Sequence, residues 1–231
     1  MQSNATTPVL AAALLLMASC DKSDTEKKTD AKTEAAVEAK ADAKADAPPK
    51  NEGPFAAFDL ADVKSKWQGA WLVDRGYVAW HVDGDKVTVF DGKAEKTLEF
   101  EVQAPCQVAV VERSDSGSSS TIHKFAFDGD TLYAGLGNAG AKKGEAIAAC
   151  VSNKVYTLQD GKCLAWKQSM FDNGRWESSD ATCTLSEGDP QTFEVEGTTL
   201  EVVGEALVDT QMKANVAAHK TSFDEAKAGL G

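Results

Sequence analysis

Several features are scarce or missing in this 231-residue chain, and each absence narrows what it can do. No apolar run approaches the roughly 20 residues that a membrane-spanning helix needs. With only three histidines and no Cys-x-x-Cys pair, a zinc site is not expected. Basic residues number 24 against 36 acidic ones, for a net charge of −12. A chain this acidic repels nucleic acid, so we predict no nucleic-acid partner. From the missing motifs we also predict no metal and no cofactor.

A short apolar run, PVLAAALLLMAS, covers residues 8–19. It is too short to span a bilayer, but it has the length of the apolar core of a signal peptide. Small residues end the run, and the charged segment DKSDTEKK begins directly after Cys20. This order predicts an export signal over residues 1–19.

The segment Leu16-Met17-Ala18-Ser19-Cys20 resembles a bacterial lipobox, in which signal peptidase II cuts before the cysteine. The sequence departs from the pattern in two places: Met17 stands where leucine is commoner, and residues 1–8 contain no Lys or Arg. The resemblance implies that Cys20 carries a diacylglycerol thioether and usually a third acyl chain. Two or three chains hold a protein stably at a membrane, so we expect an exported protein anchored to the bacterial cell envelope, on its periplasmic face or at the cell surface.

Residues 20–54 follow as the lipidated cysteine and a charged tether. The segment is built from Ala, Lys, Asp, Glu and Thr, has no aromatic residue, and contains Val37 as its one branched apolar side chain. Such a composition cannot bury enough apolar surface to offset the entropy cost of ordering. We therefore predict a disordered spacer that holds a domain away from the lipid surface.

Residues 55–231 have the length of one domain, and regular turn signals divide them. Asp-Gly and Asn-Gly favour the positive backbone angles of tight hairpins. Such dipeptides, with one Glu-Gly, occur at Asp83-Gly84, Asp91-Gly92, Asp128-Gly129, Asp160-Gly161, Asn173-Gly174 and Glu196-Gly197. Apolar residues alternate between them, as in Leu98, Phe100 and Val102, which we expect to point inward. The sequence therefore predicts a single all-β domain, an antiparallel meander of about ten strands between Gly69 and Asp209 that closes into a barrel or a sandwich.

Two helices are expected beside the strands, a short one over residues 58–66 and an amphipathic one over residues 211–230 that packs on the outside of the sheet. The triplet Gly69-Ala70-Trp71 lies where the first strand begins. It resembles the Gly-X-Trp motif that opens the lipocalin barrel, although the second lipocalin motif, Thr-Asp-Tyr, is missing. This resemblance implies an eight-stranded up-and-down barrel with a C-terminal helix outside, and a small apolar ligand.

Four cysteines remain after Cys20, an even number that implies two disulfides in an exported domain. If Asn173-Gly174 is the tip of a hairpin, Cys163 lies near Cys183. If Asp128-Gly129 is the centre of a nested pair of strands, Cys106 lies near Cys150. We therefore favour the pairs Cys163–Cys183 and Cys106–Cys150 among the three pairings that four cysteines allow.

The chain has five tryptophans, for which packing in the core is the default interpretation; the alternative is a cluster that lines a ligand cavity. The candidate ligand-binding side chains are Trp80, Trp166, Trp176 and Tyr133. The leading hypothesis is a non-enzymatic envelope lipoprotein whose β-domain binds a small apolar ligand. The alternative is a structural or assembly lipoprotein that acts through an envelope protein.

Two further motifs have simple structural interpretations. Gly135-Leu136-Gly137-Asn138-Ala139-Gly140 matches the dinucleotide fingerprint GxGxxG, but no good helix follows it. It is expected to be a glycine-rich loop between strands, which could lie at a barrel mouth. The serines of residues 116–120 suggest a polar hairpin loop, and no GxSxG surrounds them. We predict no catalytic residues; an uncharacterised hydrolase using His81 or His123 is the least favoured alternative.

Overall fold

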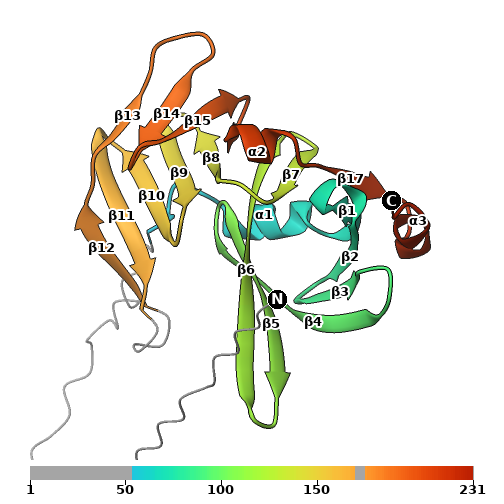
Figure 1. Cartoon of the computed structure of the whole chain (residues 1–231). Helices are drawn as coiled ribbons and strands as arrows, with labels where there is room; N and C mark the ends of the chain where they lie inside the picture. The colour runs from blue at the N-terminus through green and yellow to red at the C-terminus, as the bar shows by residue number, and fades with distance from the viewer. Residues whose placement is uncertain (1–53, 170–174, 231) are drawn as a thin grey trace, which may run out of the picture. The chain divides into compact units, whose positions relative to one another are not determined.

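The computed structural model describes residues 54–169 and 175–230, and these residues form two antiparallel sheets with a few short helices (Figure 1). The prediction of an all-β antiparallel meander closed into a barrel is confirmed. The signal, the lipobox with Cys20, and the Asn173-Gly174 turn lie outside the described residues.

The first sheet is a closed eight-stranded barrel. Its strands are β1 (Gly69–Val73), β2 (Val78–Asp83), β3 (Lys86–Phe90), β4 (Glu95–Ala104), β5 (Gln107–Ser114), β6 (Gly117–Asp128), β7 (Thr131–Gly135) and β17 (Val216–Lys220). The first seven pair in chain order, and β17 closes the barrel because it pairs with both β7 and β1. The turns predicted at Asp83-Gly84, Asp91-Gly92 and Asp128-Gly129 connect neighbouring strands, with a positive φ of 60° at Gly84.

The second sheet, called here the half-barrel, is inserted in the chain between β7 and β17. Its strands are β8 (Ala139–Lys143), β9 (Ala146–Val151), β10 (Lys154–Gln159), β11 (Lys162–Gln168), β12 (Trp176–Asp180), β13 (Cys183–Leu185), β14 (Thr192–Val195), β15 (Thr198–Val203) and β16 (Ala206–Val208). They pair in the order β12-β11-β10-β9-β8-β16-β15-β14-β13. The edge strands β12 and β13 are consecutive in the chain.

The strands between Gly69 and Asp209, β1 to β16, outnumber the ten or so that were expected. The estimate was wrong because several half-barrel strands are very short and carry weak patterns. Strand β8 has the sequence AGAKK, which has no large apolar residue, and β13 and β16 have three residues each. Neighbouring strands, rather than their own composition, hold such segments in the sheet.

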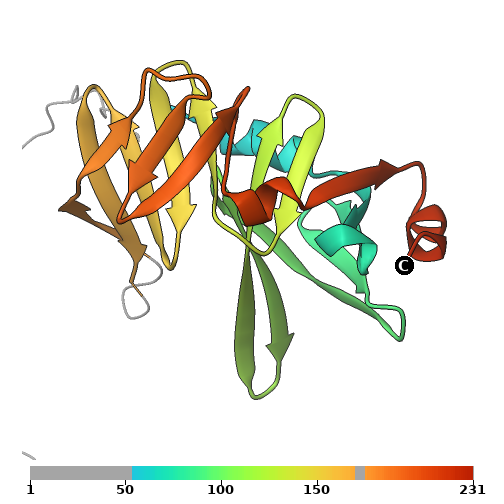
Figure 2. The same cartoon turned by 45° about the horizontal axis from the view of Figure 1, so that its top comes forward.

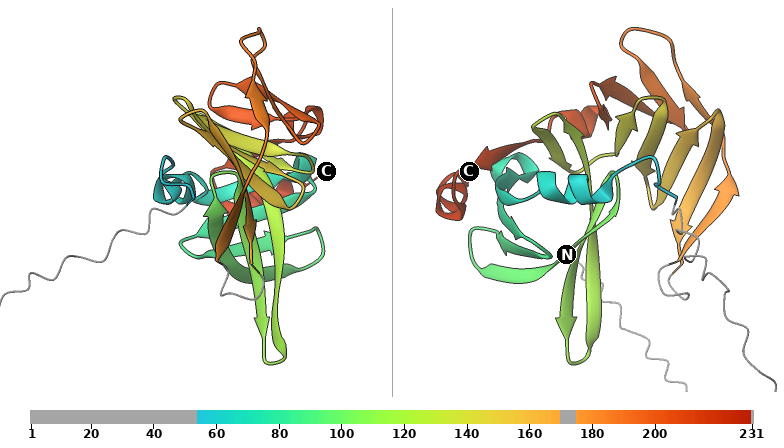
Figure 3. Two further views of the ribbon diagram at one scale, coloured as in Figure 1. Left: turned by 90° about the vertical axis from the view of Figure 1, so that its left-hand side faces the viewer. Right: turned by 180° about the vertical axis from the view of Figure 1, so that it is seen from behind.

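The predicted alternation is confirmed in the barrel. Leu98, Phe100 and Val102 of β4 all contribute to the core inside it. The centre of this core is Trp67, which is 1% exposed and lies within 6.2 Å, centroid to centroid, of five other aromatic rings. It directly follows helix α1 (Leu60–Lys66), whose N-cap Asp59 accepts hydrogen bonds from the amides of Ala61 and Asp62. Figure 3 shows α1 beside the barrel strands from behind.

Helix α1 and Trp67 close one end of the barrel. Gln68, just after the helix, accepts a hydrogen bond from the Gly84 amide of the β2–β3 turn at 2.8 Å, and Lys64 forms an ion pair with Asp85. The turns β4–β5 and β6–β7 lie at this same end because neighbouring strands are antiparallel. The opposite end carries the β1–β2 connection, with the 3-10 turn η1 (Asp74–Gly76), the β3–β4 turn and the loop after β7.

The C-terminal helix is present, but the predicted range 211–230 was wrong. Helix α2 (Thr210–Lys213) is one turn, the residues of β17 follow it, and only α3 (Phe223–Ala228) is a helix near the C-terminus. Helix α3 packs on the outer face of β1 and β2, as expected of the predicted helix (Figure 2). The segment around Val216 becomes a strand because pairing with β1 and β7 closes the barrel, and this tertiary contact overrides a helical apolar spacing.

Both disulfide pairings are confirmed: Cys106–Cys150 and Cys163–Cys183. The hairpin registers behind them were wrong. Cys163 lies opposite Ala181, not opposite position 184, as shown by the hydrogen bond that the amide of Ala181 donates to the carbonyl of Cys163 at 3.2 Å. Cys106 belongs to the β4–β5 turn of the barrel, and its disulfide reaches β9 of the half-barrel rather than a nested partner strand.

Candidate functional site

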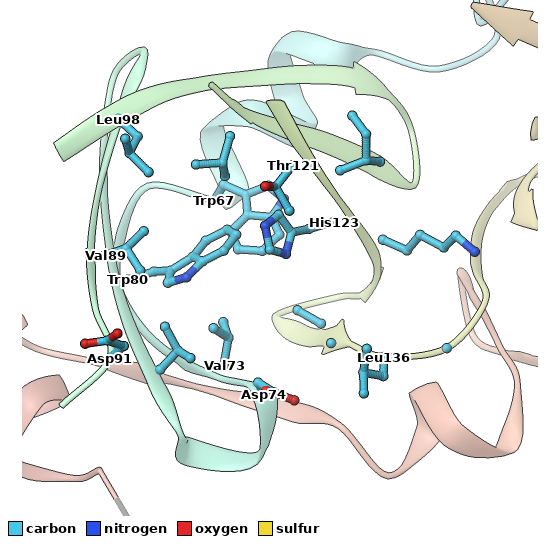
Figure 4. Close-up of a pocket in the computed structure, with 17 residues that line it drawn as sticks. Trp67, Val73, Asp74, Trp80, Val89, Asp91, Leu98, Thr121, His123 and Leu136 are labelled. Carbon is cyan, nitrogen blue, oxygen red and sulfur yellow. The ribbon is translucent and has the colours of Figure 1, made fainter. Parts of the chain in front are cut away.

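The barrel interior is filled at the α1 end and hollow at the other. A pocket of about 720 Å³ lies there, and Figure 4 shows its lining side chains directed toward a common space. The apolar lining consists of Trp67, Val73, Val78, Trp80, Val89, Leu98, Val110, Ile122, Ala134 and Leu136. The polar lining consists of Asp74, Asp91, Thr121, His123 and Lys124. An apolar cavity with a few polar groups is the usual form of a small-molecule site.

The pocket has a gap in its wall beside β6. Strand β7 ends at Gly135, which pairs with Lys124, so the residues of β6 before Lys124 have no paired strand on that side among the residues that the structure describes. The glycine-rich loop borders this gap, as Gly135, Leu136 and Gly137 line the pocket. The expectation that this loop lies at a barrel mouth agrees with its position. Gly137 has φ +135°, and a Cβ there would lie 2.7 Å from the Met212 amide nitrogen, so a larger residue does not fit.

The same end of the barrel carries large apolar side chains that remain exposed. Leu136 is 67% exposed, Tyr77 of the β1–β2 connection 61%, Val216 at the start of β17 54%, and Ile122 of β6 44%. Ile122 and Leu136 border the pocket itself. Exposed apolar residues gathered at one place are characteristic of binding surfaces rather than of an ordinary soluble face.

The β1–β2 turn presents Asp74 to the pocket from an unusual backbone conformation. Asp74, Arg75 and Gly76 have consecutive positive φ values of 50°, 58° and 86°. Each non-glycine residue with a left-handed backbone costs on the order of 1–3 kcal/mol. Such residues are found most often at functional sites. The Arg75 Nε donates to Asn215 Oδ1 at 3.0 Å, and this side-chain contact holds the turn in place.

Asn215 connects three elements around the pocket mouth. It is 1% exposed, and besides accepting from Arg75 it donates through Nδ2 to the carbonyls of Leu136 at 3.0 Å and Gln211 at 2.7 Å. The β1–β2 turn, the loop after β7 and helix α2 therefore share one buried amide. Because all of its polar atoms are used, this residue fixes the geometry of the mouth.

His123 is the histidine that lines the pocket. Its ring packs edge-on against Trp80 with centroids 4.9 Å apart. Burial lowers its pKa below the usual value of 6.5, and the negative charge of Asp74 opposes this shift. The imidazole is therefore mainly neutral at pH 7 and can both donate and accept a hydrogen bond.

Lys124 lies at the gap beside β6. Its Nζ donates to Asn138 Oδ1 at 2.8 Å, and Asn138 in turn donates to Asp209 through its amide and its side chain. Partial burial lowers the pKa of Lys124, while Asp209 opposes the shift. The negative charge of Asp209 thus offsets part of the charge of this lysine.

The structure separates the four predicted ligand-binding side chains. Trp80 lines the pocket. Tyr133 lies on the outer face of β7, packed against Ala139 and Val208 of the half-barrel. The four candidates therefore do not share one cavity.

Trp166 and Trp176 lie in the cluster around the Cys106–Cys150 disulfide. Trp166 Nε1 donates to Thr157 Oγ1 at 2.8 Å, and Trp176 packs edge-on against Phe55 with centroids 5.2 Å apart. Both therefore help to join the half-barrel to the β4–β5 turn. Neither residue borders the pocket because each lies on a half-barrel strand, on the face opposite Ala165.

Several pocket residues were missed from the sequence. Leu98 was expected to point inward, but alternation alone cannot distinguish a filled interior from a hollow one. Asp74 carried no signal, since a positive φ at an aspartate depends on the contacts of Arg75 and Asn215. Leu136 was noted only within the glycine-rich motif.

In residues 54–169 and 175–230, no group of three or more His, Cys, Asp or Glu side chains is placed to hold a metal ion. None of the helices in that part of the chain is long and apolar enough to cross a membrane.

The fold and the site define a class: a closed eight-stranded antiparallel barrel with an apolar pocket at one end and a second, disulfide-linked sheet inserted before its last strand. No protein-family model, no curated protein and no solved structure matches the chain. The function is therefore argued from the residues themselves.

Proposed function

We propose that this chain is an envelope lipoprotein, anchored through Cys20, whose barrel binds a small apolar ligand without catalysing a reaction. The observation that carries the ligand proposal is the pocket of about 720 Å³ at the open end of the barrel. Its volume falls in the range of about 300–1,000 Å³ that is usual for small-molecule sites. The two disulfides support an oxidising location, as export would provide.

The shape of the barrel supports binding rather than a role as a filled scaffold. Trp67 and its aromatic neighbours seal the α1 end, so the hollow part has a defined floor. Exposed Leu136 and Ile122 extend the apolar lining to the surface, which gives an apolar ligand a continuous path of entry. Transfer of apolar surface from water supplies about 25 cal/mol per Å² that is buried.

The ligand proposal can be tested with the uncharged fluorescent probe N-phenylnaphthylamine and two variants of adjacent residues. Leu98 lines the pocket, whereas Thr97 is exposed on the outer face of the same strand. In Leu98→Trp the larger indole occupies the ligand space, and we expect probe binding to weaken about tenfold, equivalent to ~1.4 kcal/mol. In Thr97→Trp we expect a change of less than about twofold. Equal affinities in the two variants, or no binding to the wild-type chain, would contradict the proposal.

The anchor proposal has a separate test in bacteria that express the full chain. With labelled palmitate in the medium, we expect label on the wild-type protein and none on Cys20→Ala, because the thioether requires the thiol. Ser19→Ala keeps the cysteine and is the matched control, so it should be labelled. An unlabelled wild-type protein that still reaches the membrane fraction would show that another mechanism holds it there.

A further inference from the structure

The two carboxylates that line the pocket differ in their hydrogen bonding within the protein. The Asp91 carboxylate accepts hydrogen bonds from the amides of Lys93 at 3.0 Å and Ala94 at 3.2 Å. These bonds hold the pKa of Asp91 below its usual value, so it is ionised at neutral pH. Asp74 is half-buried, and its carboxylate makes no hydrogen bond or ion pair with the described residues. The pocket therefore contains a carboxylate that is not used by the fold.

Lys124 is the one basic side chain among the described residues that line the pocket, and the negative charge of Asp209 offsets part of its charge. Lys124 donates to Asn138 beside Asp209, and Arg75 donates to Asn215. His123 is mainly neutral at pH 7, as burial depresses its pKa. A negatively charged ligand would meet two carboxylates, Asp74 and Asp91, against this single lysine. A positively charged group beside Asp74 would gain a charge-assisted hydrogen bond or ion pair.

The position of Asp74 is maintained by the surrounding structure. Its backbone and that of Arg75 are both left-handed, and the turn is fixed by the Arg75–Asn215 contact and by the Tyr77 amide, which donates to the Asp74 carbonyl at 3.2 Å. In Figure 4 the side chains of Asp74 and Asp91 lie on the same side of the pocket, below Trp80 and Val89. An apolar floor and an acidic edge thus face the same space.

We infer that the ligand is an amphiphile with a cationic head: its apolar chain lies along Trp80, Val89 and Leu98, and its amine or quaternary ammonium group lies beside Asp74. This inference rests on the proposed ligand-binding function and adds the chemical class of the ligand. Asp91 contributes to the negative potential at the mouth, and the acidic surface of the protein favours approach of a cation.

The test compares three probes with the same ten-carbon chain: decyltrimethylammonium, decanol and decanoate. Each is titrated, at concentrations at which it does not form micelles, into the full domain loaded with N-phenylnaphthylamine. We expect decyltrimethylammonium to displace the fluorophore at about one tenth of the concentration needed for decanoate, with decanol between them. The preference should shrink as salt is added, because ions screen the interaction at the open mouth.

Asp74→Asn is the key variant, since asparagine accepts the left-handed backbone as well as aspartate does. We expect it to remove most of the preference for the cation while decanol binds as before. Asp83→Asn, in the turn at the α1 end, is the matched control and should keep the full preference. Equal displacement by all three probes, or tighter binding of decanoate, would overturn the inference and leave the apolar pocket intact. Failure of all three to bind would overturn the proposed function as well.

Discussion

The barrel and the half-barrel are both curled antiparallel sheets, yet they are closed by different means. In the barrel, β17 pairs with β7 and β1, so every strand has a hydrogen-bonded neighbour on each side. In the half-barrel, the edge strands β12 and β13 do not pair with each other. The chain itself connects them through residues 181–182, and the Cys163–Cys183 disulfide joins β11 to β13. One sheet is closed by its backbone ladder and the other by covalent links.

Their interiors differ as well. The half-barrel interior contains Tyr156, Phe193, Leu200 and Leu207, each of which is 0% exposed. The barrel has comparable packing around Trp67, but the pocket occupies its other end. Apart from the gap beside β6, the ladder closes on itself, and a closed ladder can hold its shape around an empty interior. The covalently closed sheet instead relies on a filled core.

The largest expected effect within the half-barrel comes from removing its covalent closure. In Cys163→Ala/Cys183→Ala we expect the free energy of unfolding to fall by about 3 kcal/mol, because the bond closes a loop with a sequence separation of 20 residues. Urea unfolding measures the loss. Hydrogen exchange should become faster in β12, β13 and β14, while the barrel strands keep their protection.

The matched control is Cys106→Ala/Cys150→Ala, which removes the same kind of bond elsewhere. This disulfide joins the β4–β5 turn to β9, so its loss should speed exchange near residues 104–107 and 149–151 and leave β13 protected. If β13 exchanged at the wild-type rate without Cys163–Cys183, the half-barrel would be closed by its core alone. The contrast between the two sheets would then fail.

Sequence patterns predicted the barrel better than the half-barrel, and the reason is physical. Barrel strands such as β4 have one face toward the core and one toward water, so Leu98 and Phe100 alternate with Thr97 and Glu99. Half-barrel strand β9, AIAACV, is buried on both faces, from Ile147 to Val151, because its outer face packs against the Cys106 cluster. A strand buried on both sides has no alternation to detect.

The closing strand shows where sequence reasoning stops. Met212, Val216, Phe223 and Leu230 have helical spacing, but Val216 begins a strand whose partners are Tyr133 in β7 and, further along, Leu72 in β1. These partners lie more than 80 residues away, and no local pattern encodes them. Cys163–Cys183 was predicted correctly from a register that was wrong, because a hairpin estimate of proximity tolerates an error of a few residues. Cys106–Cys150 was predicted correctly although no nested hairpin brings the two cysteines together.

The site was predictable only in outline. A glycine-rich loop at a barrel mouth and an inward Trp80 could be read from the sequence, whereas the hollow between them could not. A cavity is a property of how side chains from several strands fill a volume, and Asp74 enters it through a turn fixed by Asn215, 141 residues later in the chain. The sequence alone does not distinguish Trp166 and Trp176 from Trp80, yet these two residues pack between the sheets.

The smallest expected effect is a dependence of stability on pH, which we expect to be stronger in the barrel than in the half-barrel. All three histidines lie on barrel strands, at positions 81, 123 and 219. Because the pKa of His123 is lower in the folded chain than its ordinary 6.5, the folded state binds this proton less readily than the unfolded state does. Its contribution to stability is complete above pH 6.5 and declines as the pH falls toward the lowered value. One proton limits the slope to about 1.4 kcal/mol per pH unit.

We expect the wild-type domain to be less stable at pH 5.5 than at pH 7.5, by urea unfolding, and His123→Gln to lose most of that difference. His81→Gln leaves His123 in place and should keep it. The carboxylates whose pKa values are lowered, such as Glu99 and Glu196, titrate below this window, so they do not mask the effect. Since the half-barrel has no histidine, its hydrogen exchange should respond to this pH change less than that of the barrel strands around Trp80. If His123→Gln retained the full pH dependence, the acid-sensitive group would lie outside the pocket. If the half-barrel lost its protection from exchange first, the barrel would not be the more pH-responsive of the two sheets.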